Sequence, residues 1–133
     1  MSTTPFTSNP APGFRDHPDH SIVLERVPDI VRIKVDGVQV AESASALILH
    51  ETNHTPVYYF PLEDVDPAIL RRSSRITRCP FKGKATYWNI AIGEHEVDNA
   101  LWAYELPYDE MLELAGLVGF YSSKVTIDTA SGN

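Results

Sequence analysis

A single cysteine and the lack of any long hydrophobic run exclude several classes of protein. Cys79 has no partner for an internal disulfide, and one cysteine cannot form a zinc site built from several cysteines. No stretch approaches the roughly 18 consecutive apolar residues of a transmembrane helix, and residues 1–20 lack the apolar centre of a signal peptide. We therefore expect a soluble cytoplasmic protein with no membrane association and no structural zinc. Its 133 residues suit one domain.

The common sequence motifs of catalysis and cofactor binding are also missing. The chain has no glycine-rich phosphate loop, no His-Glu-x-x-His and no Gly-x-Ser-x-Gly. His50 and His54 are four residues apart, but this spacing crosses from a predicted strand into a turn, where it does not place two ligands together. The sequence therefore predicts no metal ligands and no cofactor.

Acidic residues are absent from one long segment, between Asp66 and Glu94. This acid-free segment holds six of the eleven basic residues: Arg71, Arg72, Arg75, Arg78, Lys82 and Lys84. The rest of the chain holds the other five basic residues and all eighteen acidic ones, a net charge of −13. The total of −7 is therefore the sum of −13 there and +6 in the acid-free segment. Such a segment indicates a site for an anion, or alternatively a cationic surface that pairs with the acidic remainder. The acidic total argues against nucleic-acid binding.

The pattern of the chain indicates a leader followed by one β-rich domain. Residues 1–20 hold four of the ten prolines and show no regular period, which predicts a flexible leader or an arm that lies over the domain of residues 21–133. Strict alternation in residues 31–35 and 38–40, on either side of Asp36-Gly37, predicts a hairpin with a type I′ turn. This register places Val35 opposite Val38 and Ile33 opposite Val40.

Further segments alternate apolar and polar residues and predict short strands. They are residues 46–51, 57–60, 85–92 and 100–106, the last two joined by a looser turn at 93–96. Residues 118–120 and 125–127 form one final strand with a bulge near Ser122-Ser123. Two short helices are expected, at 67–73, where Asp66 and Pro67 suit a helix start, and at 108–115. The fold class is therefore a mostly β, single compact antiparallel domain with two short helices.

Polar and aromatic residues from several predicted strands suit a small-molecule site. If Glu51, a hydroxyl of Tyr58 or Tyr59, Lys82 and Trp102 converge, they form an apolar cleft with a few polar groups. Lys82 would contact an anion, and Glu51 would be a candidate acid or base. Alternatively, the aromatic residues belong to the core, and Glu51 is an edge carboxylate that pairs with an arginine.

Cys79 is a candidate nucleophile, because Arg78 precedes it and Lys82 follows three residues later. Neighbouring cations lower the pKa of a thiol and raise its thiolate fraction. The alternative is that Cys79 is a small buried hydrophobic residue. A nucleophilic cysteine also needs a positioned base, and the sequence does not identify one.

Several segments together resemble the domain-of-unknown-function 427 family. They are GVQVAES, ALILHE, PVYYFPLEDV, ITRCPFKGKATYW, ALWAYELP and GLVGFY, and the resemblance covers about residues 30–128. It implies a β-rich fold similar to the β-tent or Mss4-like group, whose members often hold zinc between paired cysteines that this chain lacks. The family is also labelled nucleotidyltransferase-like, with no established activity. The motif positions carried over are Glu51, Tyr58, Tyr59, Cys79, Lys82, Gly83, Tyr87 and Trp88.

These observations favour a domain that binds a small anionic ligand near the turn of residues 79–84, with catalysis left open. The predicted ligand-binding residues are Glu51, Tyr58, Tyr59, Lys82, Gly83, Tyr87 and Trp102, and the catalytic candidates are Glu51, Cys79 and Lys82. The main alternative is a non-catalytic protein-interaction module that docks through the arginines or exposed aromatic residues. Nucleotidyl transfer, thiol-based activity and homo-oligomer formation remain open.

Overall fold

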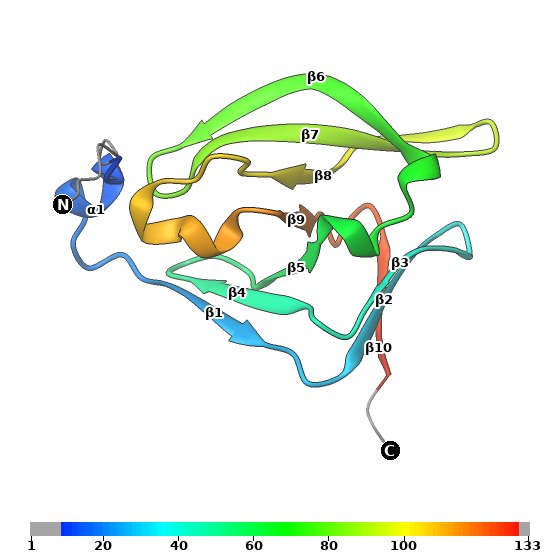
Figure 1. Cartoon of the computed structure of the whole chain (residues 1–133), viewed down its shortest axis with the longest axis horizontal. Helices are drawn as coiled ribbons and strands as arrows, with labels where there is room; N and C mark the ends of the chain where they lie inside the picture. Colours follow the sequence, from blue (N-terminus) through cyan, green and yellow to red (C-terminus); the bar gives the residue numbers. More distant parts are fainter. Residues whose placement is uncertain (1–8, 131–133) are drawn as a thin grey trace, which may run out of the picture.

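The computed structural model describes residues 9–130, which form two antiparallel sheets and a few short helices (Figure 1). The strands are β1 (Ile22–Arg26), β2 (Ile30–Val35), β3 (Val38–Ser43), β4 (Leu47–Glu51), β5 (Val57–Pro61), β6 (Leu70–Cys79), β7 (Gly83–Ile92), β8 (His95–Ala103), β9 (Leu117–Phe120) and β10 (Thr126–Ala130). The helices are α1 (Pro12–Asp16) and the 3-10 helices η1 (Leu62–Asp64), η2 (Pro67–Ile69) and η3 (Asp109–Leu114). The predicted mostly β, antiparallel fold class is confirmed.

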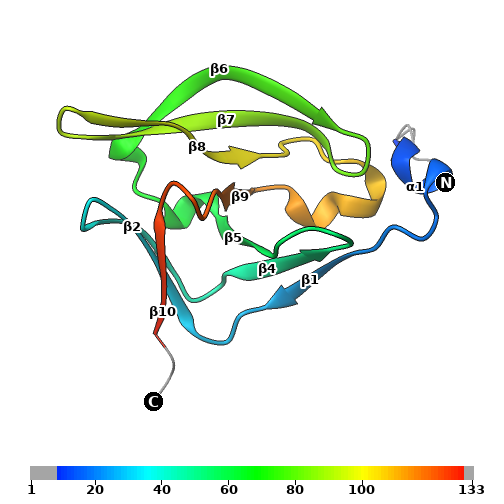
Figure 2. The same ribbon diagram turned by 180° about the vertical axis from the view of Figure 1, so that it is seen from behind.

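The larger sheet has seven strands in the order β1-β4-β5-β9-β8-β7-β6, and the smaller sheet has the order β10-β2-β3. The larger sheet curls strongly, so that β6 and β7 arch over one side of the molecule while β4 and β1 form the other (Figures 1 and 2). The smaller sheet stands at one end of this curl. The curl gives the larger sheet two packed faces, each with its own hydrophobic core.

One core lies between the two sheets, and the other lies on the opposite face of the larger sheet. Strand β7 contributes to both, because Trp88 and Tyr87 point to opposite faces and are only 8% and 5% exposed. The second core, which we call the aromatic core, contains Leu49, Tyr59, Ala85, Tyr87, Trp102, Tyr104, Met111 and Leu114. Tyrosine and tryptophan bring hydroxyl and indole N–H groups into this core, so it is the part of the molecule that combines apolar surface with polar atoms.

The first predicted hairpin forms, with a change of register. Asp36 and Gly37 both have positive φ angles, 52° and 79°, and Val35 pairs with Val38 as predicted. Ile33, however, pairs with Ala41 rather than Val40, because a bulge adds one residue to β3. The predicted position of Val40 opposite Ile33 is therefore wrong.

The predicted helix at residues 67–73 ends after one turn. Asp66 caps it as expected, since its side chain accepts a hydrogen bond from the backbone N–H of Ala68, but η2 ends at Ile69 and β6 begins at Leu70. An isolated helix of about seven residues is marginal in water, whereas β6 gains a long ladder with β7. The arginines of the acid-free segment therefore lie on the edge strand of the larger sheet, not on a helix.

The second predicted hairpin is longer and tighter than expected. Ile92 pairs with His95, so only Gly93 and Glu94 form the turn, and β8 begins at His95 rather than Ala100. Residues 95–99 are mostly exposed, because this end of the hairpin projects beyond the sheet (Figure 1). Their polar composition, which suggested a loop, reflects a strand end solvated on both faces.

The last predicted strand is two strands in different sheets. β9 lies between β5 and β8, while β10 pairs with β2, and the chain crosses between the sheets after Phe120. The change of inward parity near Ser122 results from this crossing, not from a bulge. The predicted helix at 108–115 is the 3-10 helix η3, with a non-helical Met111 and a C-terminal Gly116 at φ 84°.

Residues 9–20 lie against the rest of the domain. The backbone N–H of Gly13 donates to the carbonyl of Pro80 at 2.9 Å, and the N–H groups of Asn9 and Ala11 donate to the carboxylates of Asp109 and Glu110. Residues 1–8 of the predicted flexible leader lie outside the described residues, and the boundary at residue 20 stays a prediction. Within residues 9–130, no helix is long and apolar enough to cross a membrane. The cytoplasmic location also stays a prediction.

Candidate functional site

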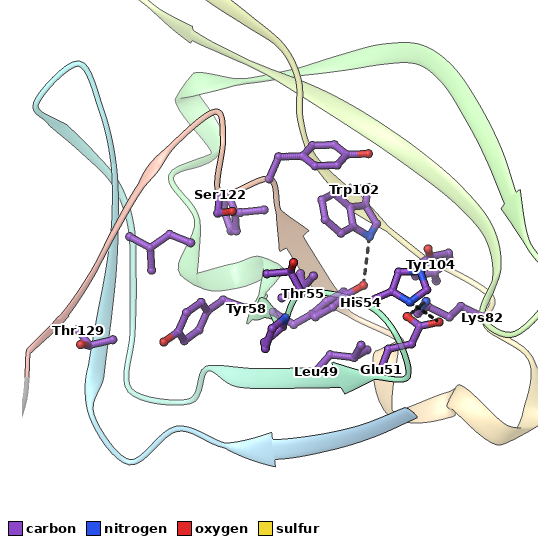
Figure 3. A pocket seen from close by; sticks show the side chains of 16 residues that line it. Leu49, Glu51, His54, Thr55, Tyr58, Lys82, Trp102, Tyr104, Ser122 and Thr129 are labelled. Carbon is purple, nitrogen blue, oxygen red and sulfur yellow. Dashed lines mark hydrogen bonds and ion pairs between the residues drawn. The ribbon is translucent and has the colours of Figure 1, made fainter. Parts of the chain in front are cut away.

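A cavity of about 670 Å³ lies beside the aromatic core (Figure 3). Its walls come from β4, β5, β8, the turn before β7 and the segment after β9. Five predicted ligand-binding residues line it together: Glu51, Tyr58, Tyr59, Lys82 and Trp102. The curled sheet therefore brings together residues that are up to 51 positions apart in the sequence.

Glu51 and Lys82 form a buried ion pair at one end of the cavity. The Nζ atom of Lys82 donates to Oε1 of Glu51 at 2.6 Å, and their side chains are only 9% and 6% exposed. Lys82 sits in the turn between β6 and β7, where its carbonyl accepts a hydrogen bond from the N–H of Tyr108. Gly83 follows at φ 127°, a conformation that other residues rarely adopt, so its role here is to shape the turn.

Two histidines complete the surroundings of Glu51. His20 donates from Nε2 to Oε2 of Glu51 at 2.7 Å, and Nδ1 of His54 lies 3.9 Å from the same oxygen. The His20 ring stacks on Phe81 at 3.9 Å between centroids and 15° between planes. Residues 9–20 thus supply His20 as a direct partner of Glu51, and no pattern in the predicted leader identified it as a site residue.

The electrostatics of this cluster keep Glu51 ionised. Burial by itself would raise the pKa of Glu51, but the hydrogen bonds from Lys82 and His20 outweigh it, and the pKa lies below its ordinary value of 4.5. The sequence left open an edge carboxylate that pairs with an arginine, whereas the structure pairs Glu51 with Lys82 and His20. A carboxyl group with a lowered pKa is deprotonated at neutral pH, so it has no proton to donate.

Aromatic side chains form the wall next to this cluster. The indole N–H of Trp102 donates to the hydroxyl of Tyr59 at 3.1 Å, and the two rings meet edge to face. Burial, with a smaller contribution from the charge of Glu51, raises the pKa of both Tyr59 and Tyr104 well above 10.0. Both phenols therefore stay neutral near neutral pH and can donate hydrogen bonds.

The hydroxyl of Tyr104 has no hydrogen-bond partner among residues 9–130. Tyr104 lines the cavity and is 8% exposed, and Figure 3 shows it close to Lys82 in the view. A buried hydroxyl without a partner costs about 1–3 kcal/mol, so almost all such groups in proteins are satisfied. The Tyr104 hydroxyl is therefore a donor available to a molecule in the cavity.

Three predicted site residues do not line the cavity: Cys79, Gly83 and Tyr87. The half-buried Cys79 packs against the aromatic core, and its Sγ atom lies 3.8 Å from Nζ of Lys82. No histidine hydrogen-bonds to this sulfur within residues 9–130. Tyr87 instead bonds through its hydroxyl to Thr77 at 2.8 Å.

His20, His54, Tyr104 and Tyr121 belong to the site but are not among the predicted site residues. Tyr104 directly follows the end of β8, and alternation along the predicted strand of residues 100–106 places it on the same face as Trp102. Tyr121 follows β9 and enters the cavity only because the chain crosses to the other sheet there.

The cations of the acid-free segment differ in whether they pair with carboxylates. Arg72 pairs with Glu105 at 3.0 Å and lies over the Trp88 ring, and Lys82 pairs with Glu51. Arg75, in contrast, makes no ion pair with a carboxylate of residues 9–130. Within the same residues, no group of three or more His, Cys, Asp and Glu is placed to hold a metal ion.

The fold and the site define a small, mostly β domain with one aromatic-walled cavity and a buried Lys-Glu pair at its end. The sequence model of a family described as "Domain of unknown function (DUF427)" and labelled NTP_transf_9 matches residues 23–131. The chain therefore belongs to this family. A search of curated proteins found no match.

Proposed function

We propose that this chain binds a small anionic molecule in the cavity between β4, β5 and β8. The observation that carries the proposal is the buried Tyr104 hydroxyl, which lines the cavity without a partner among the described residues. The Lys82 ammonium, in the wall of the same cavity, uses its three N–H donors on one carboxylate oxygen and one distant sulfur only. A ligand oxygen placed here accepts hydrogen bonds from both groups.

The remainder of the cavity suits an apolar or aromatic body. Leu49, Val57 and Trp102 contribute apolar surface, and Tyr58 lies at the opposite end of the cavity from Lys82 in the view of Figure 3. The volume of about 670 Å³ lies within the range of roughly 300–1,000 Å³ that is common for small-molecule sites. Apolar walls with a few polar groups at one end orient a ligand as well as hold it.

The charge state of the site supports binding more than proton transfer. Glu51 is ionised and already bonded through both oxygens, so it holds Lys82 in place rather than donating a proton. The Sγ atom of Cys79 lies 3.8 Å from Nζ of Lys82, and Cys79 does not line the cavity. No observation within residues 9–130 favours nucleotidyl transfer or thiol chemistry over binding.

The test is a thermal-shift screen of aromatic carboxylates, aryl phosphates and nucleotides, with a variant that fills the cavity. Ser122 lines the cavity and is exposed, so Ser122→Trp blocks it without a buried clash, while Ser123→Trp adds the same bulk outside it. We expect stabilising compounds for the wild type and Ser123→Trp, and loss of stabilisation in Ser122→Trp and Tyr104→Phe. Equal stabilisation of all four proteins, or of none, would contradict the proposal.

The second candidate is an interaction module, and the edge strand β6 is the observation that favours it. β6 pairs only with β7, and Arg78 lies opposite Lys84 with no ion pair to either among residues 9–130. An acidic extended peptide could add to this edge by backbone pairing. The exposed aromatic face expected for docking has less support, because Trp88, Tyr87 and Trp102 are at most 8% exposed.

This second function is tested with an acidic peptide and the double variant Arg78→Glu/Lys84→Glu. Binding of the peptide that the charge reversal abolishes would support the module. Binding that is unchanged by the reversal, or absent in the wild type, would contradict it. Ser122→Trp serves as the control here, because it leaves β6 untouched.

A further inference from the structure

A bulge in β6 contains Arg75, an exposed residue whose guanidinium lies over the Tyr87 ring of the aromatic core. Three residues, 73–75, lie between the paired positions Arg72 and Ile76, whereas β7 has only Tyr87 between their partners. The hydroxyl of Ser73 accepts a hydrogen bond from the N–H of Arg75 at 3.1 Å and donates to Oδ1 of Asn99 at 2.5 Å. Bulges commonly redirect a side chain. The two hydrogen bonds of Ser73 stabilise the backbone of this bulge.

The Arg75 guanidinium lies 5.1 Å from the centre of the Tyr87 ring and has no carboxylate partner among residues 9–130. Arg72 on the same strand lies over an aromatic ring in the same way, but a hydrogen bond to Glu105 neutralises it. Lys82 is neutralised by Glu51. The positive charge of Arg75 therefore lies over the aromatic core, and no carboxylate of residues 9–130 compensates it.

The Tyr87 ring over which Arg75 lies carries a hydroxyl group that bonds to the hydroxyl of Thr77 at 2.8 Å. Burial would raise the pKa of Tyr87, but the hydroxyls of Thr77 and Tyr121 and the charge of Arg75 outweigh it and lower the pKa below 10.0. The lowered pKa agrees with a local surplus of positive charge. We call Arg75, Thr77, Tyr87 and Tyr121 the Arg75 cluster.

The Arg75 cluster borders the cavity. Tyr121 belongs to both, because it lines the cavity and its hydroxyl contributes to lowering the pKa of Tyr87. Trp102 also connects the two, since its ring lies 4.4 Å from that of Tyr121 and 6.5 Å from that of Tyr87. A molecule in the cavity can thus contact Trp102 with its body and present a charged group at the cluster.

We propose that the Arg75 cluster is an oxyanion subsite, which binds a phosphate or carboxylate group of a small molecule whose apolar body occupies the cavity. This inference rests on the proposed binding function. It adds Arg75, whose charge no carboxylate of residues 9–130 pairs with, as a second charged contact besides Lys82. A guanidinium presents a planar fork of N–H donors that matches two oxygens of a phosphate or carboxylate. When Thr77 donates to the Tyr87 hydroxyl, the O–H group of Tyr87 adds a single further donor.

The test compares Arg75→Met with Arg78→Met by titration calorimetry. Arg78 lies on the same strand, is exposed and removes the same charge, so it is the matched control. The probes are phenyl phosphate, benzoate, benzyl alcohol and inorganic phosphate. We expect Arg75→Met to weaken binding of phenyl phosphate or benzoate about tenfold or more, with Arg78→Met and the neutral benzyl alcohol little affected. Equal affinities in Arg75→Met and the wild type for both oxyanions would overturn the inference.

A second measurement does not depend on affinity. Inorganic phosphate bound at the cluster adds negative charge beside Tyr87 and raises its pKa, which the ultraviolet absorbance of tyrosinate follows. The shift should be present in the wild type and Arg78→Met and absent in Arg75→Met and Tyr87→Phe. A shift that survives Arg75→Met would place the anion elsewhere and overturn the inference.

The two proposals fail in different ways. If benzyl alcohol and phenyl phosphate bind equally and only Ser122→Trp abolishes binding, the cavity function stands and the oxyanion subsite is wrong. If phosphate shifts the Tyr87 titration through Arg75, but Ser122→Trp changes the affinity of no aromatic probe, the subsite stands and the cavity function is wrong. The relative affinities of phenyl phosphate and benzoate identify which oxyanion the subsite prefers.

Discussion

Removing the charge of Lys82 should destabilise the domain far more than removing the charge of its neighbour Lys84. Both lysines belong to the β6–β7 hairpin, but Lys82 is buried against Glu51 at 2.6 Å, whereas Lys84 is exposed. Lys82→Met keeps the apolar stem and leaves the Glu51 carboxylate, which is 6% exposed, with His20 as its remaining close partner. Breaking a buried ion pair from one side costs about 3–5 kcal/mol. Because His20 remains, we expect the lower end, about 3 kcal/mol.

The free energy of unfolding is measured by urea denaturation of the wild type, Lys82→Met and Lys84→Met at one pH and one ionic strength. A loss of about 3 kcal/mol corresponds to a fall in Tm of about 10 °C for a domain of this size. Lys84→Met should change stability by no more than about 0.5 kcal/mol. Adding Glu51→Gln to Lys82→Met should restore part of the loss, because it removes the uncompensated charge.

Equal losses of unfolding free energy in Lys82→Met and Lys84→Met, below about 1 kcal/mol, would refute a strong buried interaction between Glu51 and Lys82. That result would mean that water screens the Glu51–Lys82 pair in solution, as it screens ordinary surface pairs. It would also weaken the proposal that Lys82 is held in place to donate to a ligand. Failure of the double variant to recover any stability would indicate that Lys82 acts through packing rather than charge.

Three further predictions concern other contacts of the site. Since the pKa of Glu51 in the folded chain lies below 4.5, its contribution to stability is complete above that pH and is lost as the pH falls through the lowered value. Glu51→Gln should therefore flatten the fall in unfolding free energy at acid pH. An unchanged acid limb would contradict the pKa assignment. Tyr59→Phe leaves the indole N–H of Trp102 without its acceptor and should lower the free energy of unfolding, measured by urea denaturation, by about 1–3 kcal/mol. An unchanged free energy of unfolding would show that the indole N–H reaches another acceptor. Gly13→Ala places a Cβ atom 2.7 Å from the Phe81 ring, and this clash should weaken the packing of residues 9–20, so their amide hydrogen exchange should accelerate. Unchanged protection would show that the Phe81 ring moves to make room.

Local rules predict the elements that depend on near neighbours in the chain. The Asp36-Gly37 turn forms with positive φ at both residues, because only a few residue types tolerate that conformation. Asp66 caps the chain at Ala68 and Gly116 ends η3, as side-chain and backbone chemistry prefer at such positions. The family resemblance is likewise a property of the sequence, and the match over residues 23–131 confirms it.

Long-range pairing decides the elements that were predicted wrongly. The segment after Ile69 has a plausible helix start, yet the ladder with β7 makes it a strand. β9 and β10 look like one interrupted strand until each is paired with its own sheet. In both cases the partner that determines the structure lies far away in the sequence, where local periodicity carries no information about it.

The candidate site also has features that the sequence predicts and features that only the tertiary structure determines. Residue types and alternation along the chain indicated an aromatic cleft with Glu51, Lys82 and Trp102, because these types suit burial and polar recognition wherever they converge. The charge pattern showed an acid-free segment with a surplus of positive charge. The sequence by itself therefore determined the fold class, the family and the chemical character of the site.

Only the tertiary structure decided which charges remain available. Lys82 is neutralised because the curled sheet places Glu51 beside it, and His20 joins them because residues 9–20 lie against the hairpin turn. Arg75, in the bulge of β6, remains without a carboxylate among the described residues and lies exposed over the Tyr87 ring. Coulomb interactions depend on distance in space and on burial, and a sequence specifies neither until the chain has folded.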